Sequence, residues 1–461
     1  MDPHTAPLAQ APAQPLPPHP LPPLRIGMIG IGTVGAGTLQ VLLRNQALIA
    51  ARAGRGIEVV VIAARNLARA ASVVGTAAAL TNDAMQVATH PDVEVVLEVA
   101  GGTGPARAWV LAAIAAGKHV VTANKALLAT HGNEIFAAAR QHGVVVAYEG
   151  AVAVSIPIIK ALREGLAANR IDWVVGIING TSNFILSKMR DEGMGFAQAL
   201  QQAQVLGYAE ADPAFDIEGT DAAHKITLLA ANAFGMPLRL ADAQVEGITT
   251  LQGLDVACAD QLGFRIKLLG IARRRDDHGE QGIELRVQPA LLPATHLLAH
   301  VHGSMNGIMV KGDAAGVTMY YGAGAGSEQT ASAVIADLVD IARLHGTNAA
   351  QHVPHLGFHA HAINQQLAVL PRAAVRTRHY LRVPVHSTQH VEALGAWLAT
   401  QQVPVQRIAL AHSLPTGALP QVLVLTDLVV QATVDLAVHA LAAHPAVAGP
   451  VVALRVEALE A

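Results

Sequence analysis

The chain has 461 residues, a length that fits two to four domains. Its 31 Lys and Arg and 34 Asp and Glu give a net charge of -3, without the basic excess that marks nucleic-acid-binding proteins. Every long apolar stretch is interrupted by charge, Gly or Pro, so we expect no membrane span. The single cysteine, Cys258, excludes an internal disulfide framework and favours a reducing, cytoplasmic location.

The first 23 residues are rich in Pro and Ala and lack the basic start and apolar core of a signal peptide. We expect this segment to be a disordered tail. Residues 24–29 then form a short apolar run typical of a buried parallel strand, and the sequence GIGTVGAG follows. A helix-like segment comes next, at residues 38–49.

Strand, glycine turn and helix in this order predict a dinucleotide-binding site. Gly30 permits the tight turn, Gly32 lets the backbone approach a pyrophosphate, and Gly35 lets the helix pack closely on the strand. The backbone of Thr33 and Val34 lies where amides at a helix start face a phosphate. These five residues are therefore expected to bind the cofactor.

The second predicted strand, 58–63, ends in Ala64, Arg65 and Asn66. An NAD site usually has an acidic residue here that holds the ribose hydroxyls, and this sequence has none. Arg65 could instead bind a 2'-phosphate, so we expect a preference for NADP(H) over NAD(H). The alternative is that Arg65 is an ordinary surface arginine.

Further buried strands are predicted at 93–99, 118–121 and 144–148, and repeated βα units of this kind predict a Rossmann-like α/β domain over residues 24–148. Lys125 comes just after one of these strands. Ligands collect at the carboxyl ends of strands in open α/β sheets, so Lys125 is a candidate site residue.

Residues 206–229 carry the strongest chemical signal, a run of carboxylates followed by Lys225. Asp221 and Lys225 are four apart in a predicted helix and therefore share a face. One interpretation is a surface ion pair of little consequence. However, the rest of the helix is nearly all Ala, Ile and Leu, which predicts that it is buried, and buried charges usually have a function.

The chain beyond residue 345 has a different organisation. Residues 346–379 are expected to form a linker with a histidine group, whose spacing suits a transition metal although no Cys or acidic partner is near. The group comprises His352, His355, His359 and His361. Residues 380–461 show a βαββαβ order, which predicts a ferredoxin-like domain.

Together, several of these stretches resemble homoserine dehydrogenase, in the monofunctional bacterial form with a C-terminal ACT domain. The matching stretches are GIGTVG (30–35), GGTGPA (101–106), TANKALLA (122–129), EGAVAVSIPII (149–159), NGTSNFIL (179–186), LGYAEADPAFDIEGTDAAHK (206–225) and GAGAG (322–326). The resemblance implies NAD(P)-dependent interconversion of L-homoserine and L-aspartate 4-semialdehyde, on the route to threonine, methionine and isoleucine. It also implies a substrate-binding, catalytic and dimerisation domain over residues 149–345. The last helix of this segment either stays in that domain or returns to the nucleotide-binding domain. The resemblance further implies a homo-oligomer, either a dimer or a tetramer.

The resemblance assigns roles to individual residues. Lys225 matches the lysine that exchanges a proton with the substrate oxygen, and Asp221 matches the acid that supports it. Lys125 matches a lysine that contacts both substrate and cofactor. Glu210 and Asp216 match carboxylates near the amino acid portion of the substrate.

Other family features concern ions and the cofactor. Gly326 matches a glycine at the cofactor. Family members bind a monovalent cation, usually sodium, through positions that correspond to Glu149 and the backbone carbonyls of Val152, Val154 and Ile156. The sequence departs from the family at Val154-Ser155, where a Gly-Gly pair is common.

A second departure is in the C-terminal part, where PVHSTQHVEALG lacks the turn at which ACT domains bind an amino acid. Two interpretations of the ACT domain therefore remain: it binds an amino-acid effector, or it serves only in the assembly of the oligomer. Two alternatives to homoserine dehydrogenase activity remain at this point: another NAD(P)-dependent amino-acid dehydrogenase, or a non-catalytic nucleotide-sensing regulator.

Overall fold

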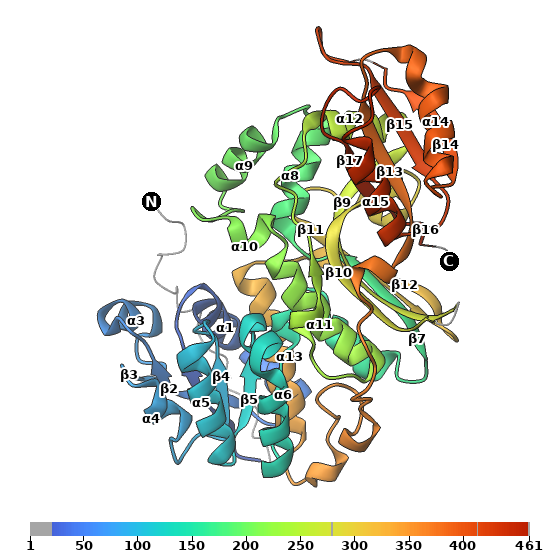
Figure 1. Ribbon diagram of the computed structural model, residues 1–461. Coiled ribbons are helices and arrows are strands. Elements are labelled where there is room, and N and C mark those ends of the chain that lie inside the picture. Colours follow the sequence, from blue (N-terminus) through green and yellow to red (C-terminus); the bar gives the residue numbers. More distant parts are fainter. Residues whose placement is uncertain (1–20, 278–279, 413, 460–461) are drawn as a thin grey trace. The chain divides into compact units, whose positions relative to one another are not determined.

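The computed structural model describes residues 21–277, 280–412 and 414–459 (Figure 1). The chain divides into two compact units, each made of three segments. Unit 1 contains the chain up to residue 170 together with residues 227–240 and 322–365. Unit 2 contains residues 171–226 and 241–321 and the chain from residue 366 onward.

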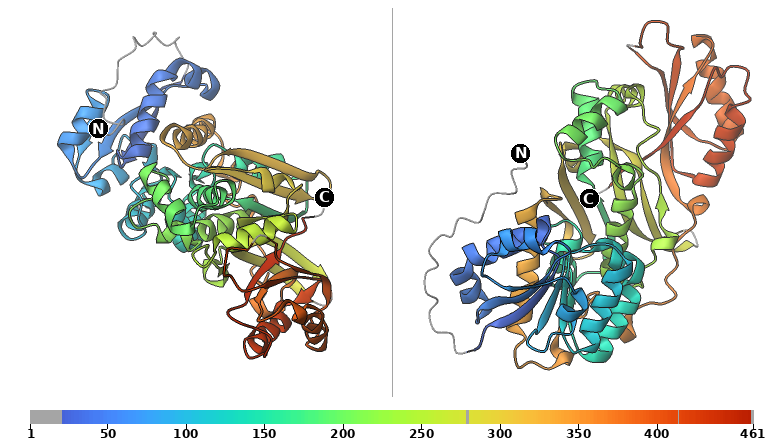
Figure 2. Two further views of the ribbon diagram at one scale, coloured as in Figure 1. Left: turned by 90° about the horizontal axis from the view of Figure 1, so that it is seen from above. Right: turned by 90° about the vertical axis from the view of Figure 1, so that its left-hand side faces the viewer.

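A six-stranded parallel sheet forms the centre of unit 1, with the order β3-β2-β1-β4-β5-β6. Its strands are β1 (Leu24–Ile29), β2 (Ile57–Ala63), β3 (Ala79–Thr81), β4 (Val95–Glu98), β5 (His119–Thr122) and β6 (Val146–Ala147). The central strands are buried apolar runs, as expected of a parallel sheet covered by helices on both faces (Figure 2). The strand order reverses between β1 and β4, and the carboxyl ends of such neighbours form the usual ligand crevice of this fold.

The helices of unit 1 connect and cover these strands. They are α1 (Thr33–Arg44), α2 (Gln46–Ala53), α3 (Leu67–Val74), α4 (Ala84–Ala88), α5 (Gly104–Ala115), α6 (Lys125–His142), α7 (Ile158–Lys160) and α13 (Ser327–Arg343). Apolar residues of α1, α2 and α13 share one buried core with β1, β2 and β4. The late helix α13 thus stabilises the same face of the sheet as the helix that follows the glycine loop.

The predicted helix at 38–49 is wrong in its bounds. Helix α1 begins five residues earlier, at Thr33, with Gly32 as its N-cap, and it ends at Arg44. Asn45 leaves the helical conformation, and α2 starts at Gln46. The early start matters because it places the first turn of α1 directly after the glycine loop. The short elements α3, β3 and α4 were not predicted, because three to eight residues carry little periodicity.

Unit 2 is built on an eleven-stranded sheet whose main path is β12-β11-β7-β9-β10-β17-β13-β15-β14. The strands are β7 (Ile171–Ile177), β8 (Gln244–Val245), β9 (Phe264–Asp277), β10 (Glu280–Pro293), β11 (Met305–Gly312), β12 (Gly316–Ala323), β13 (Arg376–Pro384), β14 (Val405–Leu410), β15 (Gln421–Thr426), β16 (Val429–Val430) and β17 (Val452–Val456). The antiparallel pair β9–β10 forms the longest strand pairing among its described residues, over fourteen residues of each strand.

Helices α8 (Gly180–Asp191), α9 (Phe196–Val205), α10 (Ala214–Ile217), α12 (Gly253–Gln261), α14 (Val391–Thr400) and α15 (Gln431–Leu441) belong to unit 2. Helix α11 (Thr220–Phe234) begins in unit 2, and the division between the units falls after Ile226. Among the described helices, none combines the length and apolarity that a membrane crossing would require.

The C-terminal part of unit 2 has the expected βαββαβ order, with β13, α14, β14, β15, α15 and β17 in sequence. Its strands lie in the order β17-β13-β15-β14 and pair antiparallel, which is the ferredoxin-like arrangement. A separate apolar core lies under the two helices. A short parallel pairing of β17 with β10 joins this part to the rest of the sheet.

Candidate active site

Helix α11 places Lys225 and Asp221 together in a buried position. Their exposed fractions are 7% and 4%. The Lys225 Nζ atom lies 2.7 Å from Oδ2 of Asp221 and donates a second hydrogen bond of 2.8 Å to the carbonyl oxygen of Ile178. The interpretation of Asp221 and Lys225 as a surface ion pair is therefore wrong. The pair is buried among the apolar residues of its own helix, where desolvation makes a partner for each charge necessary.

Asn179, the N-cap of α8, connects the two carboxylates of this cluster. Its Nδ2 atom donates to Asp216 Oδ1 at 2.7 Å and to Asp221 Oδ2 at 2.9 Å. Its Oδ1 atom meanwhile accepts from the backbone amide of Ser182. Burial raises the pKa of Asp216, the nearby charge of Asp221 raises it further, and the hydrogen bond from Asn179 opposes the rise. One amide therefore holds two negative groups beside Lys225.

The predicted substrate residue Glu210 is not part of this hydrogen-bonded cluster. It is exposed, and its carboxylate makes no hydrogen bond to any residue in the described part of the chain. Its carbonyl oxygen accepts from Gln204 Nε2 at 3.1 Å. The same loop is held to α8 by the Thr181 hydroxyl, which donates to the carbonyl of Tyr208 at 2.7 Å.

In unit 1 the glycine loop has the geometry that a dinucleotide needs. Gly30 has a φ of +104°, and a Cβ there would lie 2.9 Å from the backbone of Ala100. A Cβ on Gly35 would lie 2.3 Å from the carbonyl oxygen of Gly30, so only glycine allows α1 to pack this closely. At Gly32 no atom of the described residues, apart from its own chain neighbours, lies within 4 Å of such a Cβ, so this position faces open space where a pyrophosphate can approach.

The other predicted cofactor residues lie at strand and helix ends of unit 1. Thr33 and Val34 form the first turn of α1, whose unpaired amides favour a phosphate. Arg65 is exposed and follows the carboxyl end of β2. Gly326, with a φ of +135°, is the N-cap of α13.

Lys125 is the first residue of α6 and is half-buried. Asn124 caps this helix by accepting from Leu127, and its side chain also donates to the carbonyl of Gly102 at 2.7 Å. Lys125 thus follows the carboxyl end of β5, as predicted, and its neighbour Asn124 contacts the loop that follows β4.

Glu98, a residue that the sequence reasoning missed, shapes this same edge of the sheet. It is fully buried at the end of β4, and its carboxylate accepts from the amides of Ala100 and Gly101 and from the hydroxyl of Thr122. The available signal was an acidic residue that ends an apolar strand and precedes two glycines.

Glu149 is buried and its two oxygens accept the backbone amides of Ile159 and Lys160, each at 2.9 Å. Its own amide donates to Asp337 at 2.8 Å. Burial raises the pKa of Glu149, and burial together with the charge of Glu149 raises the pKa of Asp337 to about 7. The positive charges of Lys160 and Arg163 oppose both rises in pKa.

The predicted carbonyl donors Val152, Val154 and Ile156 lie in the loop after Glu149, and Val152 and Ile156 are buried. Val154 has a φ of +30°, a region that favours glycine. The backbone therefore keeps a glycine-like conformation although the sequence has lost the Gly-Gly pair. Cation binding itself stays a prediction.

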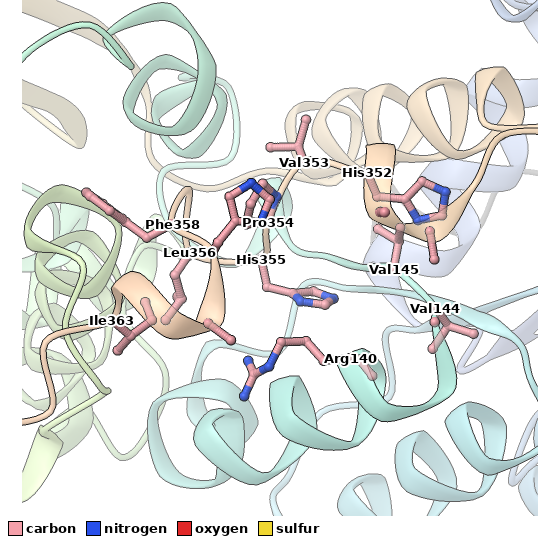
Figure 3. Close-up of a pocket in the computed structure, with 16 residues that line it drawn as sticks. Arg140, Val144, Val145, His352, Val353, Pro354, His355, Leu356, Phe358 and Ile363 are labelled. Carbon is pink, nitrogen blue, oxygen red and sulfur yellow. The ribbon is translucent and has the colours of Figure 1, made fainter.

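The histidine group does not form a metal site. His359 stacks on His361 with ring centroids 5.9 Å apart, while His355 stacks on Phe136. Figure 3 shows His352 and His355 at separate points around a cavity of about 150 Å³. Within the described ranges, no three His, Cys, Asp or Glu side chains gather in a way that could hold a metal ion.

A parallel sheet of this order with a glycine loop at its switch point, and a buried lysine–carboxylate cluster in a second unit, define a dinucleotide-dependent oxidoreductase. Residues 30–149 match the family model of the homoserine dehydrogenase NAD binding domain, and residues 157–339 match that of homoserine dehydrogenase.

Individual relatives agree with these matches. The homoserine dehydrogenase of Pseudomonas aeruginosa is 50% identical, and that of Neisseria gonorrhoeae 46% identical, each over 91% of this chain and 95% of the relative. A crystal structure of a homoserine dehydrogenase from Thiobacillus denitrificans is similar with a TM-score of 0.89 and 51% identity, covering 95% of this chain and 99% of that one.

The chain belongs to the homoserine dehydrogenase family, and it is an NAD(P)-dependent oxidoreductase with that activity. The comparisons favour neither of the two alternatives raised by the sequence, another amino-acid dehydrogenase or a non-catalytic regulator.

Proposed function

We propose that Lys225 is the group that exchanges a proton with the substrate oxygen when L-aspartate 4-semialdehyde and L-homoserine interconvert. The observation that supports this role is the buried contact of Lys225 with Asp221, which Asn179 also holds. A bound nicotinamide dinucleotide supplies or accepts the hydride. Lys225 stabilises the negative charge that develops on the oxygen, and Asp221 keeps the lysine protonated and oriented.

The remaining site residues have proposed roles in binding. Asp216 and the exposed Glu210 would hold the ammonium group of the substrate, because both are carboxylates in the same segment as Asp221. Lys125 would contact substrate and cofactor from the carboxyl end of β5. Glu149, with the carbonyls of Val152, Val154 and Ile156, would hold a sodium ion.

Substitution of Lys225 by Met tests the first role. We expect turnover with NADPH and aspartate semialdehyde to fall by about 10²- to 10⁴-fold, the usual contribution of a proton-transferring group. Lys225→Arg keeps the charge but cannot transfer the proton, so it should stay nearly as inactive. The control is Lys188→Met, since Lys188 pairs with Glu192 on the surface of α8. Normal turnover in Lys225→Met would contradict the role.

We further propose that NADP(H) is the preferred cofactor, on the strength of Arg65 at the end of β2 and the absence of an acidic residue beside it. Arg65→Glu should raise the KM for NADPH by about tenfold or more and leave the KM for NADH unchanged or lower it, because only NADPH carries the 2'-phosphate and an acidic residue here can hold the ribose hydroxyls of NADH. Steady-state kinetics with both cofactors provide the test. An equal effect on both KM values would remove the reason for the preference.

The proposal extends to the whole protein. The ferredoxin-like part is proposed to be an ACT domain, a view supported by its strand order and by the family resemblance. A cytoplasmic homo-oligomer is the state in which we expect the enzyme to work. An amino-acid effector at the ACT domain stays a prediction.

A further inference from the structure

A second cavity, of about 310 Å³, lies within unit 2 between β10, β13, α15 and β17. Lys225, Asp221 and Asn179 do not line it, so it is distinct from the candidate active site. Four polar side chains in its wall are almost fully buried: Gln288, His379, Gln431 and Arg455. Four further residues with charged or titratable side chains, all exposed, also line it: Glu246, Arg372, Asp435 and His439.

Arg455 is the principal feature of this cavity. It is only 6% exposed, and its Nε and Nη1 atoms donate to the side-chain oxygens of Gln431 and Gln288. No carboxylate in the described ranges lies within ion-pair distance of this guanidinium, and its Nη2 atom donates to no described residue. Nη2 is also not among the buried polar atoms that lack a hydrogen-bond partner, so it keeps contact with solvent. The charges of Glu457 and Glu284 act on Arg455 only from beyond ion-pair distance. A buried cation without a direct counter-ion is rare and costly, so an anion is expected to complete it.

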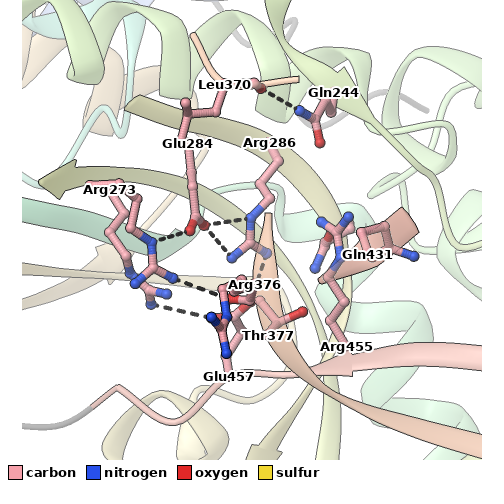
Figure 4. A network of polar contacts seen from close by, with 12 residues as sticks. Gln244, Arg273, Glu284, Arg286, Leu370, Arg376, Thr377, Gln431, Arg455 and Glu457 are labelled. Carbon is pink, nitrogen blue, oxygen red and sulfur yellow. Dashed lines mark hydrogen bonds and ion pairs between the residues drawn. The ribbon is translucent and has the colours of Figure 1, made fainter. Parts of the chain in front are cut away.

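The surroundings strengthen the demand for negative charge. Figure 4 shows Arg455 beside Gln431, apart from the contacts that join Arg286 to Glu284. That adjacent network contains three guanidiniums, from Arg273, Arg275 and Arg286, against two carboxylates, from Glu284 and Glu457. Burial, and then the charge of Arg286, lower the pKa of Arg455 to about 10, so Arg455 remains protonated at neutral pH.

Two neighbouring polar groups are also incompletely satisfied. The Nε2 atom of Gln288 is buried and has no acceptor in the described structure. The Nδ1 atom of His379 has no partner either, while its Nε2 lies 3.0 Å from Gln431 Oε1. Burial lowers the pKa of His379 to about 4, so this ring adds no charge at neutral pH. Gln288 thus brings an amide group that lacks an acceptor beside Arg455.

We propose that this cavity is a binding site for a small monocarboxylate, whose carboxylate group pairs with the guanidinium of Arg455 and the amide of Gln288. The planar guanidinium suits a carboxylate, and the cavity volume is at the small end of ligand pockets. Asp435 and Glu246 at the rim disfavour a second negative charge on the ligand. Arg372 lies 3.6 Å from Asp435 and offsets only part of the negative charge of these two carboxylates. The site therefore selects monoanions over dicarboxylates and sulfate. This proposal does not depend on the roles given to Lys225 and Lys125.

Binding can be measured directly on the full chain with acetate as the probe. Saturation-transfer NMR from protein to the acetate methyl group should show binding at constant ionic strength, and succinate or sulfate should compete less well than acetate. Arg455→Gln should weaken acetate binding by about tenfold or more, because it removes a charge-assisted hydrogen bond. Arg372→Gln, at the exposed rim, should change the affinity much less.

Gln288→Glu provides the decisive variant, because Gln288 already accepts from Arg455 and Glu has the same shape. The new carboxylate would supply the missing counter-ion from within the chain. We expect this variant to lose acetate binding and, in acetate-free buffer, to unfold at a higher temperature than the unmodified protein. This test stays informative even if Arg455→Gln does not fold.

Three results would overturn the proposal. The first is that the unmodified protein gives an acetate saturation-transfer signal no stronger than the signal of the Gln288→Glu variant. The second is tighter binding of sulfate or succinate than of acetate. The third is a Gln288→Glu variant that is less stable than the unmodified chain, which would mean that Arg455 needs no counter-ion.

Discussion

Asn179 controls the electrostatics of the buried cluster at the scale of a single residue. It supplies hydrogen bonds to two carboxylates from one nitrogen while its oxygen caps α8. Without that nitrogen, Asp216 and Asp221 would face each other with less compensation, and the pKa of Asp216, already raised by burial, would rise further.

Asn179→Asp separates these two functions, because Asp is an equally good N-cap but donates no hydrogen bond. We expect the fold to persist, kcat/KM at neutral pH to fall by about 10- to 100-fold, and the acidic limb of the kcat/KM–pH profile to move to higher pH. The direction follows because a third carboxylate raises the pKa values of its neighbours, so ionisation needs a higher pH. A uniform loss at every pH, with the limb in place, would show that Asn179 acts only through local structure.

The sequence predicted part of this site and not the rest, for a physical reason. Asp221 and Lys225 are four residues apart, so helix geometry alone places them together. Asp216 follows from the same charged stretch. The bridge from Asn179 spans 37 and 42 residues, and the bonds from Glu98 likewise depend on how strands pair. Such contacts are set by tertiary structure, which local patterns do not encode.

At the scale of the element, the glycine loop and α1 act together. The spacing of the glycines predicted the tight turn at Gly30 and the close packing at Gly35, because both impose local steric limits. The approach of a pyrophosphate at Gly32 stays a prediction. The same reasoning misplaced the start of α1, since Gly at an N-cap and Val in the first turn are weak helix signals.

Two alanine substitutions distinguish these glycines. Gly32→Ala adds a methyl group into open space, so the thermal unfolding midpoint of the free protein should not change, while the Kd for NADPH should rise by about tenfold or more. Gly35→Ala should instead lower stability by about 1–3 kcal/mol, because its Cβ would lie 2.3 Å from the Gly30 carbonyl oxygen. Thermal unfolding without cofactor and titration with NADPH measure the two effects. A stability loss in Gly32→Ala would contradict the open-space assignment.

At the scale of the whole molecule, unit 2 is held together by a buried ionic network that reaches the end of the chain. Glu457 follows β17, and its carboxylate bonds Arg286 of β10 at 2.6 Å and Arg273 of β9 at 3.2 Å (Figure 4). Burial opposes ionisation of Glu284, but the charges of Arg286 and its neighbours lower the pKa of Glu284 to about 2. The pKa of Glu457 is lowered too, against its own burial, chiefly by Arg286.

Glu457→Gln should therefore destabilise the protein by about 3–5 kcal/mol at pH 7, because it leaves buried guanidiniums with one carboxylate fewer. A carboxylate whose folded pKa is depressed contributes stability above its ordinary pKa, near 4.5, and this contribution is lost as the pH falls toward the folded value. The difference in unfolding free energy between the unmodified protein and Glu457→Gln should consequently shrink as the pH falls below the ordinary value near 4.5. Urea unfolding at several pH values measures it, with the exposed Glu192→Gln as a control expected to cost less than about 1 kcal/mol. A difference that stays constant with pH would mean that Glu457 stabilises the sheet by packing and not by its charge.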